Sequence, residues 1–336
     1  MKALMLKAIH QLELVEVPVP EIQPDELLIR TGATTICTSD VNDIHENPFG
    51  IELPVVIGHE GAGVVAALGS QVRGFHIGQR LATHPVHPCG SCQSCREGLG
   101  HLCLNMGHFG LNLPGTMAEY YRVRQDRVRP IPDTVSFPVA ALAEPVCVCL
   151  EAMVQAKLLP GSSLLILGDG PFGILMSRLA GQFSPRRVVL AGQIDYRLAF
   201  SHAAVCVNTY DSPNPVKSLM DANRGAGYDA AILAVGSRYA LMDGMKCLKP
   251  RGRMVIFSAL PGDTPVDLFN VHLKELEIVG ACSDLDMMDQ AIPLLNDPSL
   301  ALHELITHQF SIEAYRQAFH LAEKGKDRAL KVALVF

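Results

Sequence analysis

Six short apolar runs, separated by amphipathic stretches, follow one another in the second half of this chain of 336 residues. Such alternation predicts a parallel sheet wrapped by helices, because a crossover helix must return the chain before the next strand can pair in parallel. The predicted strands cover 164–167, 188–191, 205–208, 230–235, 254–257 and 276–279. After the first run, apolar residues recur at helical spacing and predict a helix with one face on the sheet. They are Phe172, Leu175, Leu179 and Phe183.

A glycine-rich segment joins the first predicted strand to this helix in the pattern G-x-G-x-x-G. Gly168 permits a tight turn, Gly170 lets a pyrophosphate approach the backbone, and Gly173 lets helix and strand pack closely. Free N–H groups at the start of the helix attract the phosphates. The segment therefore predicts a dinucleotide site. The alternative is a plain strand-to-helix turn that favours glycine.

The second predicted strand should end near an acid that binds the ribose 2′-hydroxyl of NAD. Gly192 stands there instead, Asp195 follows three residues later, and Arg197 lies beyond it. The choice between NAD and NADP therefore stays open, with a slight preference for NAD and weak discrimination against NADP. The residues predicted to contact the cofactor are Gly168, Gly170, Pro171, Phe172, Gly173, Gly192, Asp195, Arg197 and Val235.

The first 140 residues have a different pattern, with Gly and Pro every few positions and β-branched runs such as 55–57 and 64–65. This pattern predicts a strand-rich, loop-rich domain. The later helical patterns at 287–295 and 312–324 and the closing apolar run 329–336 are expected to return to it. The predicted organisation is a strand-rich domain at 1–145, a dinucleotide-binding domain at 146–285 and a segment at 286–336 that returns to the first domain.

Four of the ten cysteines fall within fifteen residues, namely Cys89, Cys92, Cys95 and Cys103. Their spacing, C-x2-C-x2-C-x7-C, supplies four thiolates close enough to form a tetrahedron around one zinc ion. Because protein ligands would take all four positions, the predicted role of this zinc is structural. Two disulfides, an iron–sulfur cluster and an accidental cluster are the alternatives.

The composition of the chain excludes several classes of protein and partner. A net charge of −6 without a basic tract argues against nucleic acid as a partner. With 49% hydrophobic and 18% charged residues, the chain is not a disordered scaffold. We find no uninterrupted run of about 18 apolar residues, and so expect neither a membrane span nor a signal peptide. The remaining cysteines lie mostly among apolar neighbours, as buried thiols of a reducing compartment do. We expect a cytoplasmic protein with a small-molecule partner.

Two further segments place zinc ligands in apolar surroundings: Cys37, and the pair His59 and Glu60. Singly, each is a weak signal, because a lone buried cysteine is usually part of the core and a lone histidine usually a satisfied hydrogen-bonding residue. These three residues become informative only when they are considered together with the motifs in the rest of the chain.

That pattern resembles, from end to end, the zinc-dependent medium-chain dehydrogenase/reductase family. The four-cysteine lobe, the segment 114–120, the glycine-rich turn and the segments 248–253 and 274–280 resemble family landmarks in the same order. The resemblance implies an α/β fold class, with a Rossmann doubly wound parallel sheet plus a strand-rich GroES-like catalytic domain, in a homodimer or homotetramer. The family motif G-H-E-x2-G-x5-G-x2-V matches at Gly58, His59, Glu60, Gly63, Gly69 and Val72.

The resemblance also implies a catalytic zinc bound by Cys37 and His59, with Glu60 as a further or exchangeable ligand, and hence two zinc ions per chain. In ethanol-type members the third protein ligand is a cysteine, whereas in sorbitol-type members it is a glutamate followed by proline. Here Glu144 is followed by Pro145, which favours the polyol branch. The implied reaction is hydride transfer between a secondary alcohol or polyol, such as a sugar alcohol or cyclitol, and NAD(P).

Residues around Cys37 complete the implied catalytic set. Ser39 matches the family's relay hydroxyl, and Asp40 resembles a carboxylate that orients a metal ligand. The family's relay histidine is absent, because Asn42 stands at its position, and His45 is interpreted as a surface residue. The predicted catalytic residues are Cys37, Ser39, His59, Glu60 and Glu144.

Three other functions are considered. The first is a threonine-type dehydrogenase of the same family, acting on an amino alcohol. The second is a non-catalytic, crystallin-type member, although such members tend to lack the metal ligands. The third is a zinc-ribbon nucleic-acid module, against which the net charge counts. The substrate pocket is expected to be lined by 42–49, by 107–113 and by the loop near Ser283. The first two segments contain no Arg or Lys, which mildly favours neutral substrates.

Overall fold

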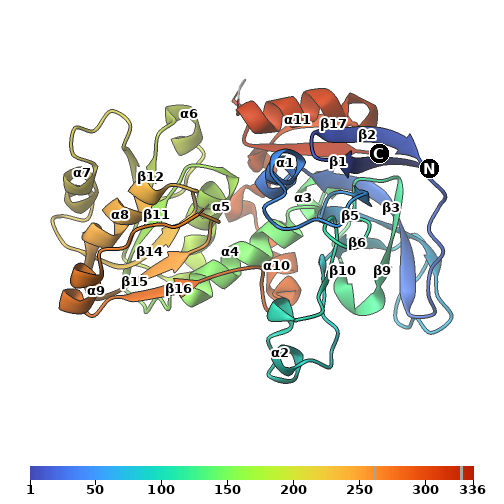
Figure 1. Ribbon diagram of the computed structural model, residues 1–336, viewed down its shortest axis with the longest axis horizontal. Coiled ribbons are helices and arrows are strands. Elements are labelled where there is room, and N and C mark those ends of the chain that lie inside the picture. Colours follow the sequence, from blue (N-terminus) through green and yellow to red (C-terminus); the bar gives the residue numbers. More distant parts are fainter. Residues whose placement is uncertain (261, 326–327) are drawn as a thin grey trace. The chain divides into compact units, whose positions relative to one another are not determined.

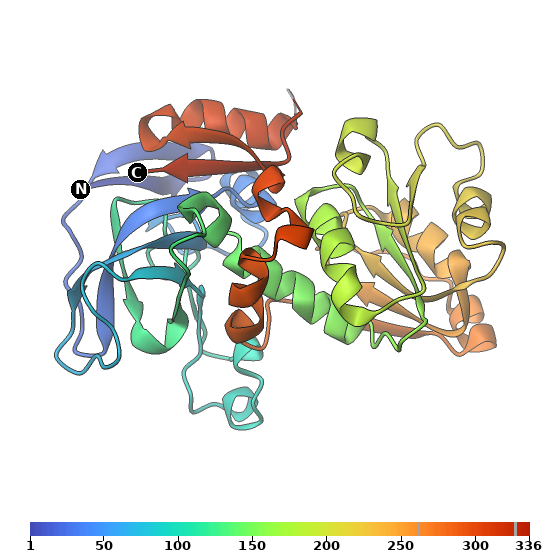
Figure 2. The ribbon, with the colours of Figure 1, turned by 180° about the vertical axis from the view of Figure 1, so that it is seen from behind.

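The computed structural model describes residues 1–260, 262–325 and 328–336, whose backbone forms two compact units. One unit comprises Met1–Cys147 and Leu285–Phe336, and the other comprises Val148–Asp284. Figure 1 labels the elements, and Figure 2 shows the same ribbon from behind. The C-terminal segment thus belongs to the same unit as the N-terminus.

The second unit is built on a six-stranded sheet in the order β13-β12-β11-β14-β15-β16, with every neighbouring pair parallel. All six predicted strands are present. They are β11 (Ser163–Leu167), β12 (Arg187–Gly192), β13 (Val205–Asn208), β14 (Tyr228–Leu233), β15 (Leu248–Ile256) and β16 (Glu277–Gly280). Strand order reverses between β11 and β14, and in such sheets ligands bind at the carboxyl ends of the strands beside the reversal.

Helices cover both faces of this sheet. A side chain added at Gly173 would lie 3.6 Å from Ile166, whereas one at Gly244 would meet Leu167. Because Ile166 and Leu167 are neighbours in β11, they point to opposite faces. The doubly wound fold predicted from the sequence is therefore confirmed. The helices are α5 (Pro171–Leu179), α6 (Asp195–Leu198), α7 (Pro215–Ala222), α8 (Arg238–Cys247) and α9 (Leu268–Lys274), with the 3-10 turn η3 (Ala180–Phe183).

The first unit is strand-rich, as predicted, and its main sheet has seven strands. Six follow the order β10-β6-β5-β3-β18-β17, and the seventh, β9, also pairs with β3. These strands are β3 (Glu26–Thr35), β5 (Glu60–Leu68), β6 (Arg80–Thr83), β9 (Tyr120–Arg124), β10 (Val128–Pro130), β17 (Ile306–Ser311) and β18 (Lys331–Val335). Two small sheets contain β1 (Lys2–Ala8), β2 (Gln11–Glu16) and β4 (Val55–Val56), and β7 (Val86–His87) and β8 (Gly107–His108).

The two ends of the chain share one hydrophobic core in this unit. Leu4 and Ile57 are buried in the same cluster as Phe319 and Leu334. Strand β18 pairs antiparallel with β3, so the closing apolar run becomes an interior strand. The helices of this unit are α1 (Thr38–His45), α2 (Gln93–Arg96), α3 (Phe137–Ala140), α10 (Met288–Leu295) and α11 (Tyr315–Lys324), and α4 (Ala143–Gln155) begins in it. Its 3-10 turns are η1 (Gly100–Leu102), η2 (Gln125–Arg127), η4 (Pro298–Leu300), η5 (Leu302–Leu305) and η6 (Ile312–Ala314).

One stretch, Phe137–Gln155, is long and apolar enough to cross a membrane by length and composition alone. Most of it is buried inside the protein, as in a core helix. It contains α3 and α4, whose apolar residues pack in the interior.

Candidate active site

Three side chains picked out by the sequence motifs converge in the first unit. The Cys37 sulfur, a His59 ring nitrogen and a Glu60 carboxylate oxygen all lie within 4.8 Å of one another. Cys37 is the N-cap of α1, and Glu60 begins β5 directly after His59. Strand pairing places Glu60 opposite Thr35, two residues before Cys37. The register of β3 against β5 therefore brings the two segments together, and all three residues are at most 9% exposed.

Glycines beside these ligands are required by the packing. Gly58 has a φ of +95°, and a side chain there would also lie 2.6 Å from Met117. At Gly63, an added Cβ would lie 2.2 Å from the carbonyl oxygen of Arg30 on β3. The glycines of the G-H-E motif thus allow the close strand contact that positions His59 and Glu60.

The donor set fits zinc. A thiolate, an imidazole nitrogen and a carboxylate oxygen are ligands that zinc accepts in catalytic sites with an open position. Burial, and then the charge of Glu60, raise the pKa of Cys37, which keeps the thiol protonated unless a cation compensates. A buried sulfur beside a buried carboxylate is therefore an arrangement that a divalent cation stabilises.

Asp40 holds two of these ligands in place. Its Oδ2 accepts a hydrogen bond of 2.8 Å from the backbone N–H of Cys37, and its Oδ1 lies 3.3 Å from Nδ1 of His59. This contact leaves Nε2 of His59 as the ring nitrogen that could bind a metal ion. Burial acts to lower the pKa of His59, but the charge and hydrogen bond of Asp40 outweigh it and raise that pKa. Ser39 Oγ lies 3.5 Å from Nε2 of His59.

Lys331 is a site residue that the sequence analysis missed. Its Nζ lies 2.6 Å from the Glu60 carboxylate, and both side chains are almost completely buried. Thr35 Oγ1 donates to the same carboxylate. Burial acts to lower the pKa of Lys331, but Glu60 and then Cys37 outweigh it and raise that pKa. The ammonium neutralises Glu60, which suits Glu60 to the role of an exchangeable ligand. The sequence feature that could have identified Lys331 is that it is the single charged residue within the apolar run 329–336.

Glu144 lies in the first turn of α4 and is buried. Among the residues that the structure describes, the group whose ligand atoms all fall within 4.8 Å contains Cys37, His59 and Glu60 but not Glu144. Glu144 is nevertheless close enough for its charge to help raise the pKa of Lys331. A direct role of Glu144 at the metal stays a prediction.

Two histidines near α1 and β8 have different surroundings. His108 lies beside His59, with ring centroids 5.7 Å apart, and its Nδ1 donates to the carbonyl of Phe109 at 2.7 Å. Burial, and then His59, lower the pKa of His108 to about 3, so the ring is neutral. His45 instead contacts His10 and lies 3.7 Å from Glu323 near the surface. His108 was included in the expected pocket segment but not singled out as a residue.

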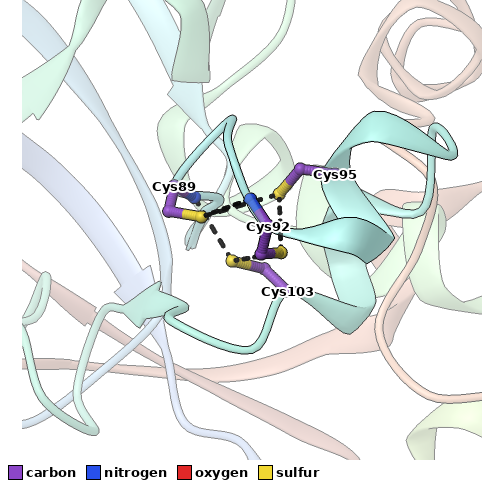
Figure 3. A group of neighbouring side chains, drawn as sticks. All are labelled: Cys89, Cys92, Cys95 and Cys103. Carbon is purple, nitrogen blue, oxygen red and sulfur yellow. Dashed lines mark hydrogen bonds between the residues drawn. The ribbon is translucent and has the colours of Figure 1, made fainter.

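The four cysteines of the lobe also converge, and Figure 3 shows their sulfur atoms turned toward one another. All four ligand atoms lie within 4.8 Å, and none of the four cysteines forms a disulfide. The sulfur atoms are separated by 4.0 Å (Cys89 to Cys95), 3.5 Å (Cys92 to Cys95) and 3.8 Å (Cys92 to Cys103). Four thiolates at 2.3 Å from one zinc would be about 3.8 Å apart. The lobe therefore fits a tetrahedral ion.

The glycine-rich turn in the second unit leaves room for a phosphate group. Gly168 has a φ of +124°, and an added Cβ at Gly173 would lie 1.9 Å from the carbonyl oxygen of Gly168. At Gly170, by contrast, an added Cβ would meet nothing within 4 Å. Gly170 is the N-cap of α5, and Pro171 begins that helix. Open space at a helix N-terminus is what a pyrophosphate needs.

The other predicted cofactor residues lie around the carboxyl ends of the same sheet. Gly192 ends β12, and Val235 follows β14. Asp195 begins α6, where its carboxylate accepts a hydrogen bond of 2.7 Å from Asn208. Arg197 Nε donates to the hydroxyl of Tyr196, and the Phe172 ring packs edge-on against Phe257.

Comparison with known proteins gives two family matches. Residues 23–133 match the profile of the alcohol dehydrogenase GroES-like domain, and residues 184–297 match that of zinc-binding dehydrogenases. The chain is 32% identical to an L-threonine 3-dehydrogenase of Chromobacterium violaceum, with 97% of each chain covered. It is 30% identical to a sorbitol dehydrogenase of Bacillus subtilis, over 99% of this chain and 96% of that protein.

Solved structures are similar over the whole chain. A candidate zinc-binding dehydrogenase of Sinorhizobium meliloti, bound to NADP, has a TM-score of 0.93 and 25% identity, covering 100% of this chain and 99% of its own. A dehydrogenase of Escherichia coli in complex with NADH, described as a short chain alcohol dehydrogenase, has a TM-score of 0.92 and 26% identity, with the same coverage.

Proposed function

The chain belongs to the zinc-dependent medium-chain dehydrogenase/reductase family and is an NAD(P)-linked oxidoreductase that acts on alcohols; we propose that its substrates are neutral secondary alcohols of the polyol class. The observation that carries the zinc-dependent chemistry of this proposal is the buried convergence of Cys37, His59 and Glu60. We further propose that the first unit is the catalytic domain and that Val148–Asp284 holds the dinucleotide.

The side chains of the cluster and its neighbours would have different roles in the reaction. Cys37, His59 and Glu60 would hold the zinc, which when bound supplies a Lewis acid that lowers the pKa of an alcohol hydroxyl, as it does for water. The nicotinamide supplies the hydride acceptor. Asp40 fixes the ring of His59 through Nδ1, and Lys331 compensates the charge of Glu60. Burial of these groups keeps water from screening their charges.

Ser39 is proposed to take the substrate's hydroxyl proton. Its Oγ lies 3.5 Å from the metal-binding nitrogen of His59, so an alcohol oxygen near the metal would come within reach of it. A serine hydroxyl can accept one proton while donating its own, which makes it a relay rather than a final acceptor.

The substrate class is inferred from charge. The segments 42–49 and 107–113 contain no Lys or Arg, whereas Asp43 and Glu46 lie in the first of them. A carboxylate on the substrate would find no Lys or Arg partner in these segments and would be repelled by the two acids of the first. This favours uncharged polyols. The threonine-type alternative is retained because an L-threonine 3-dehydrogenase is 32% identical over 97% of the chain.

A kinetic screen tests the proposal. Zinc-loaded protein is assayed with sorbitol, xylitol and myo-inositol beside L-threonine and simple amino alcohols, each with NAD⁺ and NADP⁺. We expect the highest kcat/KM with a polyol. A clear preference for L-threonine would replace the polyol assignment with the amino-alcohol alternative. Absence of any dehydrogenation in protein that contains zinc would contradict both.

Glu144→Gln tests the residue on which the polyol branch depends. The change keeps the shape of the side chain but removes a negative charge near the metal site. We expect kcat/KM on a secondary alcohol to fall about 10-fold to 100-fold, the range for losing a supporting group at a metal. If Glu144 only favours the start of α4 through the helix dipole, turnover and zinc affinity will stay at the wild-type level. Glu151→Gln, on the same helix, is the control.

Three finer features are also proposed. The chain binds two zinc ions, one at the catalytic cluster and one at the four-cysteine lobe. It works in the cytoplasm as a homodimer or homotetramer. Elemental analysis of purified protein and light scattering measure the first and the last of these.

A further inference from the structure

Asp169, the second residue of the glycine-rich turn, reaches across to the end of the neighbouring strand. The backbone N–H groups of Gln193 and Ile194 both donate to its Oδ2, each at 2.7 Å. These N–H groups follow Gly192, the last residue of β12. A carboxylate therefore lies at the carboxyl end of β12, although β12 itself ends without an acid.

Gly192 is the residue that makes room for this carboxylate. A side chain at position 192 would place its Cβ 2.5 Å from Cβ of Asp169 and 2.6 Å from its Oδ2. Any residue larger than glycine would collide with the bound side chain. Gly192 and Asp169 therefore form one arrangement. Gly192 stands where the sequence was expected to have an acid, and Asp169 supplies a carboxylate there from the adjacent loop.

We propose that Asp169 is the residue that recognises the adenosine ribose and selects NAD over NADP. The inference rests on the proposed function, because it assumes that a dinucleotide binds at this turn. In sheets of this kind, the ribose 2′-hydroxyl lies at the end of the second strand and bonds to an acid there. Asp169 supplies that acid. Both of its described hydrogen bonds use Oδ2. We therefore propose that Oδ1 accepts the hydrogen bond from the ribose hydroxyl.

A 2′-phosphate would meet two obstacles at this place. Its negative charge would lie beside the Asp169 carboxylate, and like charges brought together at a partly buried site repel each other and weaken binding. The N–H groups of Gln193 and Ile194, which would otherwise bind a phosphate oxygen, are already satisfied by Asp169. The internal carboxylate thus occupies the anion site that NADP would need.

Asp195, the acid that follows Gly192 by three residues, is engaged elsewhere. Its Oδ1 accepts a hydrogen bond of 2.7 Å from the side-chain amide of Asn208 on β13. The weak discrimination expected from Gly192 and Asp195 alone is therefore replaced by a stronger expectation. We expect NADH to bind about 100-fold more tightly than NADPH.

The test compares binding of the two reduced coenzymes to the full chain. Dissociation constants are measured through the fluorescence of the bound nicotinamide, for the wild type, Asp169→Ala, Asp169→Asn and Asp195→Asn. In Asp169→Ala the two N–H groups are released and the charge is removed, so we expect the preference for NADH to fall about 100-fold, mainly because NADPH binds more tightly. Asp169→Asn keeps an acceptor oxygen but loses the charge, and we expect a fall of about 10-fold. Asp195→Asn is expected to keep the wild-type ratio.

Several results would overturn the inference. Equal affinity of the wild type for both coenzymes would do so, as would a ratio unchanged in both Asp169 variants or a loss of preference in Asp195→Asn. In these cases the NAD(P)-linked function stands, because coenzyme still binds. If neither coenzyme binds to the zinc-loaded wild type, the proposed dinucleotide site fails along with the inference. Should Asp169→Ala not fold, Asp169→Asn alone decides, since its oxygen can still accept from the loop.

Discussion

Cys37→Ser is expected to lower kcat for alcohol oxidation by about 10⁴-fold or more, while the protein stays folded. Serine is a poor zinc ligand, so the change removes the thiolate from a cluster in which only His59 and Glu60 would remain. Loss of the Lewis acid removes several kcal/mol of stabilisation from the reacting oxygen. Elemental analysis should show zinc falling from two ions per chain to one, and the melting temperature should change by only a few degrees.

Cys247→Ser is the matched control. Cys247 is also buried, and it lies in the second unit, where its thiol contacts the carbonyl of Val216. Serine keeps that donor, so zinc content and kcat should stay at the wild-type values. A Cys37→Ser protein with two zinc ions and normal turnover would disprove the assignment of the catalytic metal.

Cys92→Ser should show the opposite pattern, with a loss of stability that precedes any loss of chemistry. The segment between Cys89 and Cys103 has only the four-residue helix α2, the short turn η1 and few buried side chains to hold it. Metal binding at such a lobe contributes folding energy directly, about 10–16 kcal/mol in small zinc peptides. We expect the melting temperature to fall by about 10 °C or more and proteases to cleave within 89–103.

Ser94→Ala, in the same short helix, serves as the control and should resist proteolysis like the wild type. The pair of cysteine variants distinguishes the two proposed metal sites, because one variant should lose activity with its fold intact and the other should lose the fold of the lobe. If the Cys92→Ser protein keeps the wild-type melting temperature and both zinc ions, the prediction that a zinc ion stabilises the lobe is wrong.

Features encoded within a short stretch of chain were predictable from the sequence. The four lobe cysteines lie within fifteen residues, so their spacing alone indicates a common ion. The glycines of the G-x-G-x-x-G turn act on backbone atoms a few residues away, as the contact between Gly173 and Gly168 shows. The apolar runs of the six strands were equally local signals. The helical stretch predicted after the turn, whose apolar residues extend to Phe183, forms an α-helix only as far as Leu179 and continues as the 3-10 turn η3 through Phe183.

Features that depend on pairing between distant segments were not predictable. Lys331 meets Glu60 across 271 positions, and only the order of β5, β3 and β18 in the sheet places them together. Asp169 appeared to be an arbitrary residue between two glycines. Its meaning comes from the parallel pairing of β11 with β12, which brings their carboxyl ends side by side. The same pairing changes the interpretation of Gly192 from a missing acid to a space for one.

The position of Lys331 also sets an order of events during synthesis. Ribosomes deliver the proposed ligands Cys37, His59 and Glu60 early, but the ammonium that balances Glu60 arrives with β18, 271 residues after Glu60. Until then, enclosing the Glu60 carboxylate in the core would leave a buried charge uncompensated. A nascent chain should therefore keep this region open to solvent and to metal, and close it only when the final strand enters the sheet.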